Sequence, residues 1–366
     1  MSLTVPLIAG RAREPTPHPV PAYGGSQQTQ HRSGSRYLHG PGDSLRSGRL
    51  SSEVVAHHDF GKCRDGDSGA ATPSRSRCPY DFGMRQGMIT VDGDVTVAYC
   101  EMGEGPPIVC LPGWSQAAEQ FIPVMEELAS SHRMIALDHR GHGRSSQPGR
   151  GYRLHRLAAD LHEVLLALDL GQATLLGHSM GVAVIWAYLD VFGDTGIDHF
   201  VFADSRPTLV RDRDWSDTEA RIAGGTQTLA QLEDLTHRLR SPDGWNALVD
   251  VIRNMVSPDL PPERFESLIA TNRPTTNETR ATLWYDECTY DWRDLIPTVS
   301  RPTLVVHGLG SMIPVESQRW IADAIPRGQF ATIPAEEGGS HFAFWENPER
   351  FGEIIGNFLD RPTTLH

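Results

Sequence analysis

Hydrophobic residues follow a regular pattern only from about residue 86 onward. Short runs rich in Val, Ile and Leu alternate there with longer segments in which apolar residues recur every three or four positions. The short runs are typical of buried strands, and the longer segments are typical of helices that pack on a sheet. Strand patterns cover residues 87–93, 95–103, 107–113, 133–138, 173–179, 199–204, 302–308 and 330–334, and helix patterns cover 116–130, 156–170, 180–192, 315–325 and 348–359.

The order of these segments predicts the fold class. The first two strands flank an Asp-Gly-Asp turn and are expected to form a hairpin. The other six alternate with helices, which predicts an eight-stranded, mostly parallel α/β sheet with helices on both faces. Residues 205–297 interrupt the alternation with a polar, helical segment that is too long for a loop. We therefore predict a core in two parts, 85–204 and 298–366, with an inserted helical cap at 205–297.

Residues 1–84 have no apolar period and are rich in Gly, Ser, Pro, Arg and His. A segment of this composition buries too little apolar surface to offset the entropy that ordering costs. We therefore predict a disordered tail. The alternatives are a translation start at Met84 or Met88 and a targeting segment, although the prolines of the tail oppose an amphipathic helix.

Charge and cysteine usage narrow the class of protein. Residues 1–85 carry a net charge of +4, whereas the rest carries −17, which argues against nucleic acid as a partner. No apolar run is long enough to span a membrane. We expect reduced thiols in a cytoplasmic protein, and a homo-oligomer is compatible with the sequence. The cysteines, none at metal-ligand spacing, are Cys63, Cys78, Cys100, Cys110 and Cys288.

The pentapeptide GHSMG at 177–181 joins a predicted strand to a predicted helix. It fits the G-x-S-x-G pattern, in which a tight turn holds a serine exposed at the edge of a sheet. Glycines on both sides of the serine allow the backbone to approach neighbouring elements, and the helix N-terminus supplies donors for an anion. Ser179 is the predicted nucleophile.

Four motifs follow one another along the chain at the ends of predicted strands: LPGW (111–114), DHRGHGRSS (138–146), GHSMG (177–181) and GGSHFAFWENPERF (338–351). Their order and spacing over residues 86–360 resemble those of the α/β-hydrolase fold superfamily. The chain resembles its capped serine hydrolases, in the haloperoxidase and esterase-like branch. This resemblance implies a triad in the chain order Ser, acid, His, and no cofactor.

His341 occupies the position of the catalytic base in this resemblance, in a Gly-rich loop after the last predicted strand. His178 neighbours the serine, and we interpret it as packing or pocket lining. His139 and His142 form an H-x-x-H pair without a third ligand in view, so no metal site is predicted there.

The carboxylate expected to orient His341 does not lie at the position that the resemblance implies. The resemblance puts it in HGLGSMIP (307–314), where Ser311 cannot carry the charge that stabilises an imidazolium, and Glu316 lies beyond Pro314. Asp204 ends the strand at 199–204 and is expected at the same sheet edge as the serine, so it is the predicted acid. The alternatives are Asp291, Glu336 and Glu337, or a purely structural role for Asp204.

The oxyanion hole and the pocket complete the predicted site. By position, the backbone N–H groups of Met180 and Trp114 are the donors. Four of the eight tryptophans fall within 205–297, which indicates a hydrophobic roof, although each ring could equally pack the cap on the core. The predicted pocket residues are Trp114, His178, Trp215, Trp284 and Phe342.

These residues predict a serine hydrolase that cleaves an ester or lactone of a small apolar or aromatic substrate. Thioester, amide or carbon–carbon bond hydrolysis would use the same groups. The first alternative is a cofactor-free oxygenase or a haloperoxidase-like perhydrolase; Ser115 and Gln116, with no histidine after Trp114, argue against oxygenation. The second alternative is a ligand-sensing receptor that retains the triad.

Overall fold

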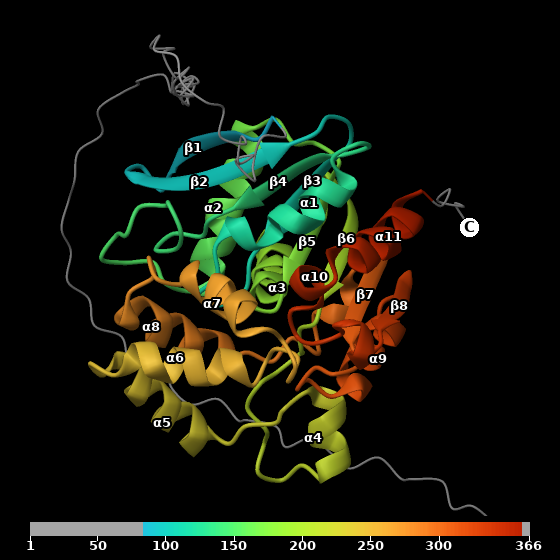
Figure 1. Ribbon diagram of the computed structural model, residues 1–366. Helices are drawn as coiled ribbons and strands as arrows, with labels where there is room; N and C mark the ends of the chain where they lie inside the picture. The colour runs from blue at the N-terminus through green and yellow to red at the C-terminus, as the bar shows by residue number, and fades with distance from the viewer. Residues whose placement is uncertain (1–82, 361–366) are drawn as a thin grey trace, which may run out of the picture. The chain divides into compact units, whose positions relative to one another are not determined.

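The computed structural model of the protein describes residues 83–360 (Figure 1). The predicted tail, except for Gly83 and Met84, and the segment from 361 to 366 lie outside the described residues. The same holds for Cys63 and Cys78.

The centre of the described part is an eight-stranded sheet in the order β1-β2-β4-β3-β5-β6-β7-β8. β1 pairs with β2 as an antiparallel hairpin and β2 pairs antiparallel with β4, whereas the other pairs are parallel. The predicted fold class is therefore confirmed. The strands are β1 (Arg85–Val91), β2 (Val95–Met102), β3 (Pro107–Leu111), β4 (Arg133–Leu137), β5 (Ala173–His178), β6 (Ile197–Ala203), β7 (Thr303–Gly308) and β8 (Gly328–Ile333).

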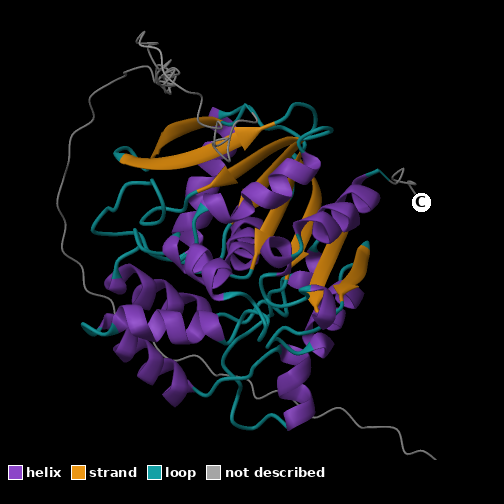
Figure 2. Ribbon diagram, in the orientation of Figure 1, coloured by secondary structure: helices purple, strands orange, loops and turns teal. Residues whose placement is uncertain are grey.

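Helices lie on both sides of this sheet (Figure 2). α1 packs against α11, and α2 packs against α3. The central strands β3 to β7 are buried along almost their whole length, which explains their continuous apolar runs, whereas the edge strands β1 and β8 are partly exposed. These helices are α1 (Ile122–Leu128), α2 (Leu154–Ala167), α3 (Met180–Phe192), α9 (Val315–Ala324), α10 (Ala343–Glu346) and α11 (Pro348–Leu359), with 3-10 turns η1 (Ala118–Phe121), η2 (Ile296–Thr298) and η3 (Ala335–Glu337).

Five further helices lie between β6 and β7, where the sequence predicts a cap. They gather at one end of the sheet, with α5 packed on α6 and α8, and α4 on α9 (Figure 1). An antiparallel bridge between Thr208 and Asp291 joins the entry of this segment to its return. The helices are α4 (Asp217–Ala223), α5 (Leu229–Arg240), α6 (Gly244–Arg253), α7 (Pro262–Ala270) and α8 (Asn277–Cys288).

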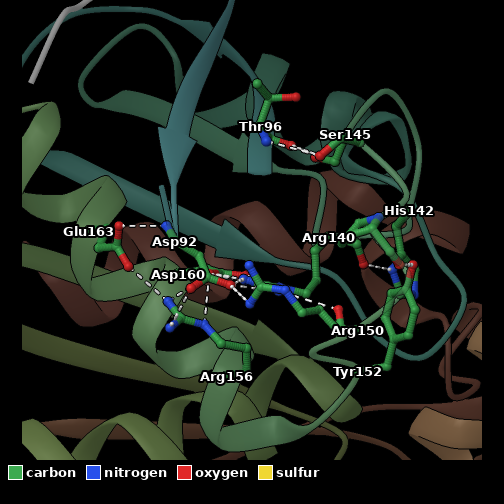
Figure 3. A network of polar contacts seen from close by, with 12 residues as sticks. Asp92, Thr96, Arg140, His142, Ser145, Arg150, Tyr152, Arg156, Asp160 and Glu163 are labelled. Carbon is green, nitrogen blue, oxygen red and sulfur yellow. Dashed lines mark hydrogen bonds and ion pairs between the residues drawn. The ribbon is translucent and has the colours of Figure 1, made fainter. Parts of the chain in front are cut away.

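A buried ion network fixes the loop after β4 (Figure 3). Arg140 is fully buried and donates to both Asp160 carboxylate oxygens of α2, at 2.5 and 2.6 Å, and to Asp92 in the β1–β2 turn at 3.3 Å. Arg156 adds bonds to Asp160 and Glu163. The network ties the hairpin, the loop and α2 together, and loss of one partner from such a buried pair costs about 3–5 kcal/mol.

Candidate active site

Ser179 lies in a strained turn between β5 and α3. Its backbone has φ 53° and ψ −119°, a conformation that non-glycine residues rarely adopt outside functional sites. The flanking glycines are required by space. A Cβ at Gly181 would lie 2.0 Å from the Leu111 carbonyl oxygen, and one at Gly177 would lie 2.6 Å from the Val182 nitrogen.

The strand register aligns the next residues along the same sheet edge. His178 pairs with Ala203, and Ala203 pairs with Val306, in three adjacent parallel strands. The residues that follow them are Ser179, Asp204 and His307, so these three lie in one row where the strands end.

Asp204 receives the ring of the predicted base. His341 Nδ1 lies 2.6 Å from Asp204 Oδ2, and both side chains are buried. Asp204 has φ 49°, which turns the chain sharply at the end of β6. Ser179 and His341 line the same pocket. The structure therefore brings together the serine, the histidine and the carboxylate that the sequence singled out.

Two further side chains hold the same carboxylate, and sequence reasoning missed both roles. His307 Nδ1 lies 2.5 Å from Asp204 Oδ1, and Ser311 Oγ donates to Oδ2 at 2.5 Å. Burial alone would raise the pKa of the Asp204 carboxyl, but the hydrogen bonds from His307 and His341 outweigh it and hold this pKa well below its usual range. Ser311, at the position where the resemblance puts the acid, thus supports a carboxylate that comes from the neighbouring strand.

The alternative acids lie elsewhere. Asp291 forms an exposed pair with Arg293 at 2.6 Å. Glu336 and Glu337 are exposed in η3, and Glu316 pairs with Arg221 at the surface.

Hydrogen bonds from Gly113 and Trp114 fix the loop that follows β3. Gly113 N–H donates to Gln116 Oε1 at 2.9 Å, and Trp114 Nε1 donates to the Arg280 carbonyl of α8 at 2.8 Å. The backbone N–H groups of Trp114 and Met180 have no hydrogen-bond acceptor within residues 83–360. Met180 begins α3, so its N–H also carries the positive end of a helix dipole. Both groups are available to an oxyanion.

Trp215 does not line the pocket, contrary to the sequence prediction, and of the two roles predicted for His178, packing and pocket lining, the structure shows packing. The His178 ring is fully buried, with Nε2 2.8 Å from the His341 carbonyl oxygen and Nδ1 3.0 Å from Gln116 Oε1. Burial, together with the nearby His341, lowers the pKa of His178 to about 3, so the ring is neutral at pH 7. It packs against the loop that carries His341. The Trp215 ring stacks instead on the Arg293 guanidinium, 4.4 Å from its centroid.

The pocket over Ser179 has a volume of about 470 Å³, including its open mouth. Trp114, Trp284 and Phe342 line it, as the sequence predicts, and the two indole rings lie 5.0 Å apart. Arg206 and Glu287 also line it, and sequence reasoning did not single them out. Arg206 follows Asp204 closely in the chain, which is the one signal that could have pointed to it.

The H-x-x-H pair of the sequence is a packed and buried pair of rings. His139 and His142 stack edge to face at 5.9 Å, and burial lowers the pKa of His139 to about 4 and of His142 to about 3. Between residues 83 and 360 there is no group of three or more His, Cys, Asp or Glu side chains that could hold a metal ion. Likewise, none of the helices described is long and apolar enough to cross a membrane.

Comparison with known proteins gives the family. A sequence model of the alpha/beta hydrolase fold family matches residues 106–348, about two thirds of the chain. Non-heme chloroperoxidase CPO-A1 of Kitasatospora aureofaciens is 26% identical over 299 residues, covering 74% of this chain and 98% of that protein. A bromoperoxidase structure from Bacillus anthracis has a TM-score of 0.69 at 24% identity, over 76% of this chain and 100% of that one. An esterase structure from Exiguobacterium antarcticum has a TM-score of 0.67 at 22% identity, over 75% and 99%. These two structures are less than 25% identical to this chain and show the fold alone. Because the family model matches about two thirds of the chain, the protein is an enzyme of the alpha/beta hydrolase fold family.

Proposed function

We propose that the protein is a serine hydrolase that cleaves a carboxylic ester or lactone of a small molecule. The observation that carries this proposal is the 2.6 Å contact between His341 Nδ1 and the buried Asp204 carboxylate, in a pocket that Ser179 also lines. A nucleophile needs a base, and the base needs an oriented carboxylate.

In the first half of the reaction, Ser179 Oγ attacks the substrate carbonyl while His341 Nε2 accepts the hydroxyl proton. The imidazolium that forms keeps its Nδ1–H on Asp204, which stays ionised. The backbone N–H groups of Met180 and Trp114 hold the oxyanion of the tetrahedral intermediate. Collapse of this intermediate expels the alcohol, which takes the proton from His341, and leaves an acyl-enzyme on Ser179.

In the second half, His341 removes a proton from water, which attacks the acyl carbonyl. The second tetrahedral intermediate uses the same two donors, and its collapse releases the acid and returns the proton to Ser179. Support from His307 and Ser311 matters in both halves, because each donates to the Asp204 carboxylate that stabilises the imidazolium.

The lining of the pocket supports a small and partly apolar substrate. Leu209, Ile252, Met255 and Phe342 line the pocket together with Ser179, so most of the side chains near the scissile bond are apolar.

A perhydrolase activity is the second candidate, and the chloroperoxidase and bromoperoxidase names among the related proteins favour it. Hydrogen peroxide would replace water in the second half, so that its oxygen attacks the acyl carbonyl and a peracid leaves. A bromide-oxidation assay with acetate and peroxide tests it. Halogenation that exceeds hydrolysis of a simple ester would move this candidate to the front.

The decisive test is labelling of the full-length protein with a fluorophosphonate probe, beside the Ser179→Ala variant. We expect labelling of the wild type and none of the variant, because phosphonylation requires an activated serine. A folded wild type that resists the probe would contradict both candidates, since both depend on the same nucleophile.

A further inference from the structure

The pocket contains a buried cation that lacks a direct ionic partner. Arg206 is 5% exposed, and its guanidinium donates through Nη1 to the Thr226 hydroxyl at 2.7 Å. No carboxylate lies within ion-pair distance of it in the described part of the chain. Asp204, close by, is already held by His307, His341 and Ser311.

Two residues of α8 that line the same pocket, Trp284 and Glu287, each carry an unpartnered polar atom. Trp284 and Glu287 are spaced three residues apart, so they share one face of the helix. Trp284 Nε1 and Glu287 Oε2 are buried and have no hydrogen-bond partner among the described residues. These side chains are 3% and 6% exposed. A buried polar atom without a partner is costly, and such atoms often mark a place that a ligand fills.

We propose that Arg206, Trp284 and Glu287 form a carboxylate subsite, so that the substrate of this hydrolase carries a free carboxylate besides the scissile bond. This inference rests on the proposed function and names its substrate class. A carboxylate has two oxygens with four acceptor positions, which suits a guanidinium and an indole N–H. Its negative charge also provides the counterion that the Arg206 guanidinium does not have among the described residues.

Glu287 fits this subsite as a donor. Burial raises the pKa of its carboxyl to about 8, although Arg206 opposes this effect. At neutral pH it is therefore mostly protonated and can donate to an acceptor in the pocket. A neutral substrate would leave the Arg206 cation without a counterion, whereas a carboxylate uses all three groups.

A matched pair of esters tests the subsite in the full-length protein. Mono-4-nitrophenyl glutarate and 4-nitrophenyl pentanoate share the leaving group and a five-carbon acyl chain, and differ in a terminal carboxylate. We expect the wild type to prefer the glutarate ester in kcat/KM at pH 7. In Arg206→Gln this preference should fall by roughly 10- to 100-fold, as expected when a charge-assisted hydrogen bond to a buried group is lost. An unchanged preference would overturn the subsite.

Three variants separate the subsite from other effects. Arg206→Lys keeps the charge without the planar fork, so it should retain part of the preference. Glu287→Gln keeps a neutral donor, so the preference at pH 7 should persist. Arg221→Gln removes an exposed cation of the same segment, paired with Glu316 outside the pocket, and should leave the preference unchanged. Equal losses in Arg221→Gln and Arg206→Gln would reduce the effect to net charge and contradict the subsite.

Titration calorimetry with glutarate gives a readout without turnover, in the wild type and in both Arg206 variants. Glutarate should bind the wild type at least tenfold more tightly than Arg206→Gln, and glutaramide should not compete. If Arg206→Gln fails to fold, the Arg206→Lys variant and the glutaramide comparison decide. Loss of fluorophosphonate labelling with intact glutarate binding would refute the hydrolase alone. Labelling without Arg206-dependent binding would refute the subsite alone.

Discussion

Replacement of Asp204 by Asn tests the relocated acid most directly. The wild-type carboxylate accepts hydrogen bonds from His341 and Ser311 on Oδ2 and from His307 on Oδ1. An asparagine of the same shape has only one acceptor oxygen, so its amide NH₂ must face at least one of these donors. The ring of His341 then loses both its negative partner and its preferred tautomer.

The expected loss is large. Removal of the charge from a triad acid lowers kcat by about 10⁴, which corresponds to roughly 5–6 kcal/mol of transition-state stabilisation. The charge in this site is strongly held, because the pKa of Asp204 is far below its usual range despite complete burial. By contrast, Ser311→Ala removes one hydrogen bond to the carboxylate and leaves the charge, so it should cost about 1.5–3 kcal/mol, or roughly 10- to 150-fold in rate.

A rescue experiment adds a second condition. Ser311 Oγ lies 2.5 Å from Asp204 Oδ2, which itself lies 2.6 Å from His341 Nδ1. A carboxylate at position 311 therefore starts within reach of the same ring. We expect the double variant Asp204→Asn with Ser311→Asp to have a kcat/KM at least tenfold higher than that of Asp204→Asn alone. Asp204→Asn with near-wild-type turnover of a 4-nitrophenyl ester, confirmed as folded by its melting temperature, would refute the reasoning.

Three further predictions concern stability. Burial raises the pKa of Glu287 from 4.5 to about 8, so between these values the folded state holds a proton that the unfolded state has lost, and the free energy of unfolding falls by up to about 1.4 kcal/mol for each pH unit. Glu287→Gln removes this cost, so the increase in melting temperature that it causes should grow from pH 5 to pH 8. An increase that does not change with pH would contradict this prediction. Gly181→Ala places a Cβ against the Leu111 carbonyl oxygen and should lower the free energy of unfolding in urea by about 3 kcal/mol or more. Gly171→Ala is the control, because a Cβ there meets nothing within 4 Å. Equal losses in the two variants would contradict the steric argument. Asp160→Asn leaves Arg140 buried with a weakened partner and should lower the free energy of unfolding by about 3 kcal/mol; a loss below 1 kcal/mol would show that the network is not needed.

The fold was predictable because its signals are local. Each strand of the parallel sheet is a short apolar run that needs no alternation, and each covering helix has its own period. The turn at Ser179 was also predictable, because the G-x-S-x-G spacing is typical of a tight strand-to-helix turn; the structure adds the steric reason for both glycines.

The remaining parts of the site depend on contacts between distant segments. Nothing in the sequence shows that the Trp215 ring stacks on Arg293, or that the His178 ring is covered on every side. Arg206 and Glu287 line one pocket although they are far apart in the chain. A charged residue in a polar helical segment is usually exposed, so its composition conceals this pair.

His307 is the intermediate case, and it explains why the acid can change strands. In adjacent parallel strands, residues that follow paired positions lie side by side, so the register Ala203–Val306 places Asp204 beside His307 at the edge where Ser179 also lies. A carboxylate from the end of either β6 or β7 can then reach His341, provided that the other strand supplies donors rather than a second charge. His307 and Ser311 are such donors. Two carboxylates in this space would compete for one proton, because like charges this close cannot both stay ionised. The serine at position 311 is therefore the complement of the aspartate at position 204, and the two positions should be read as one site.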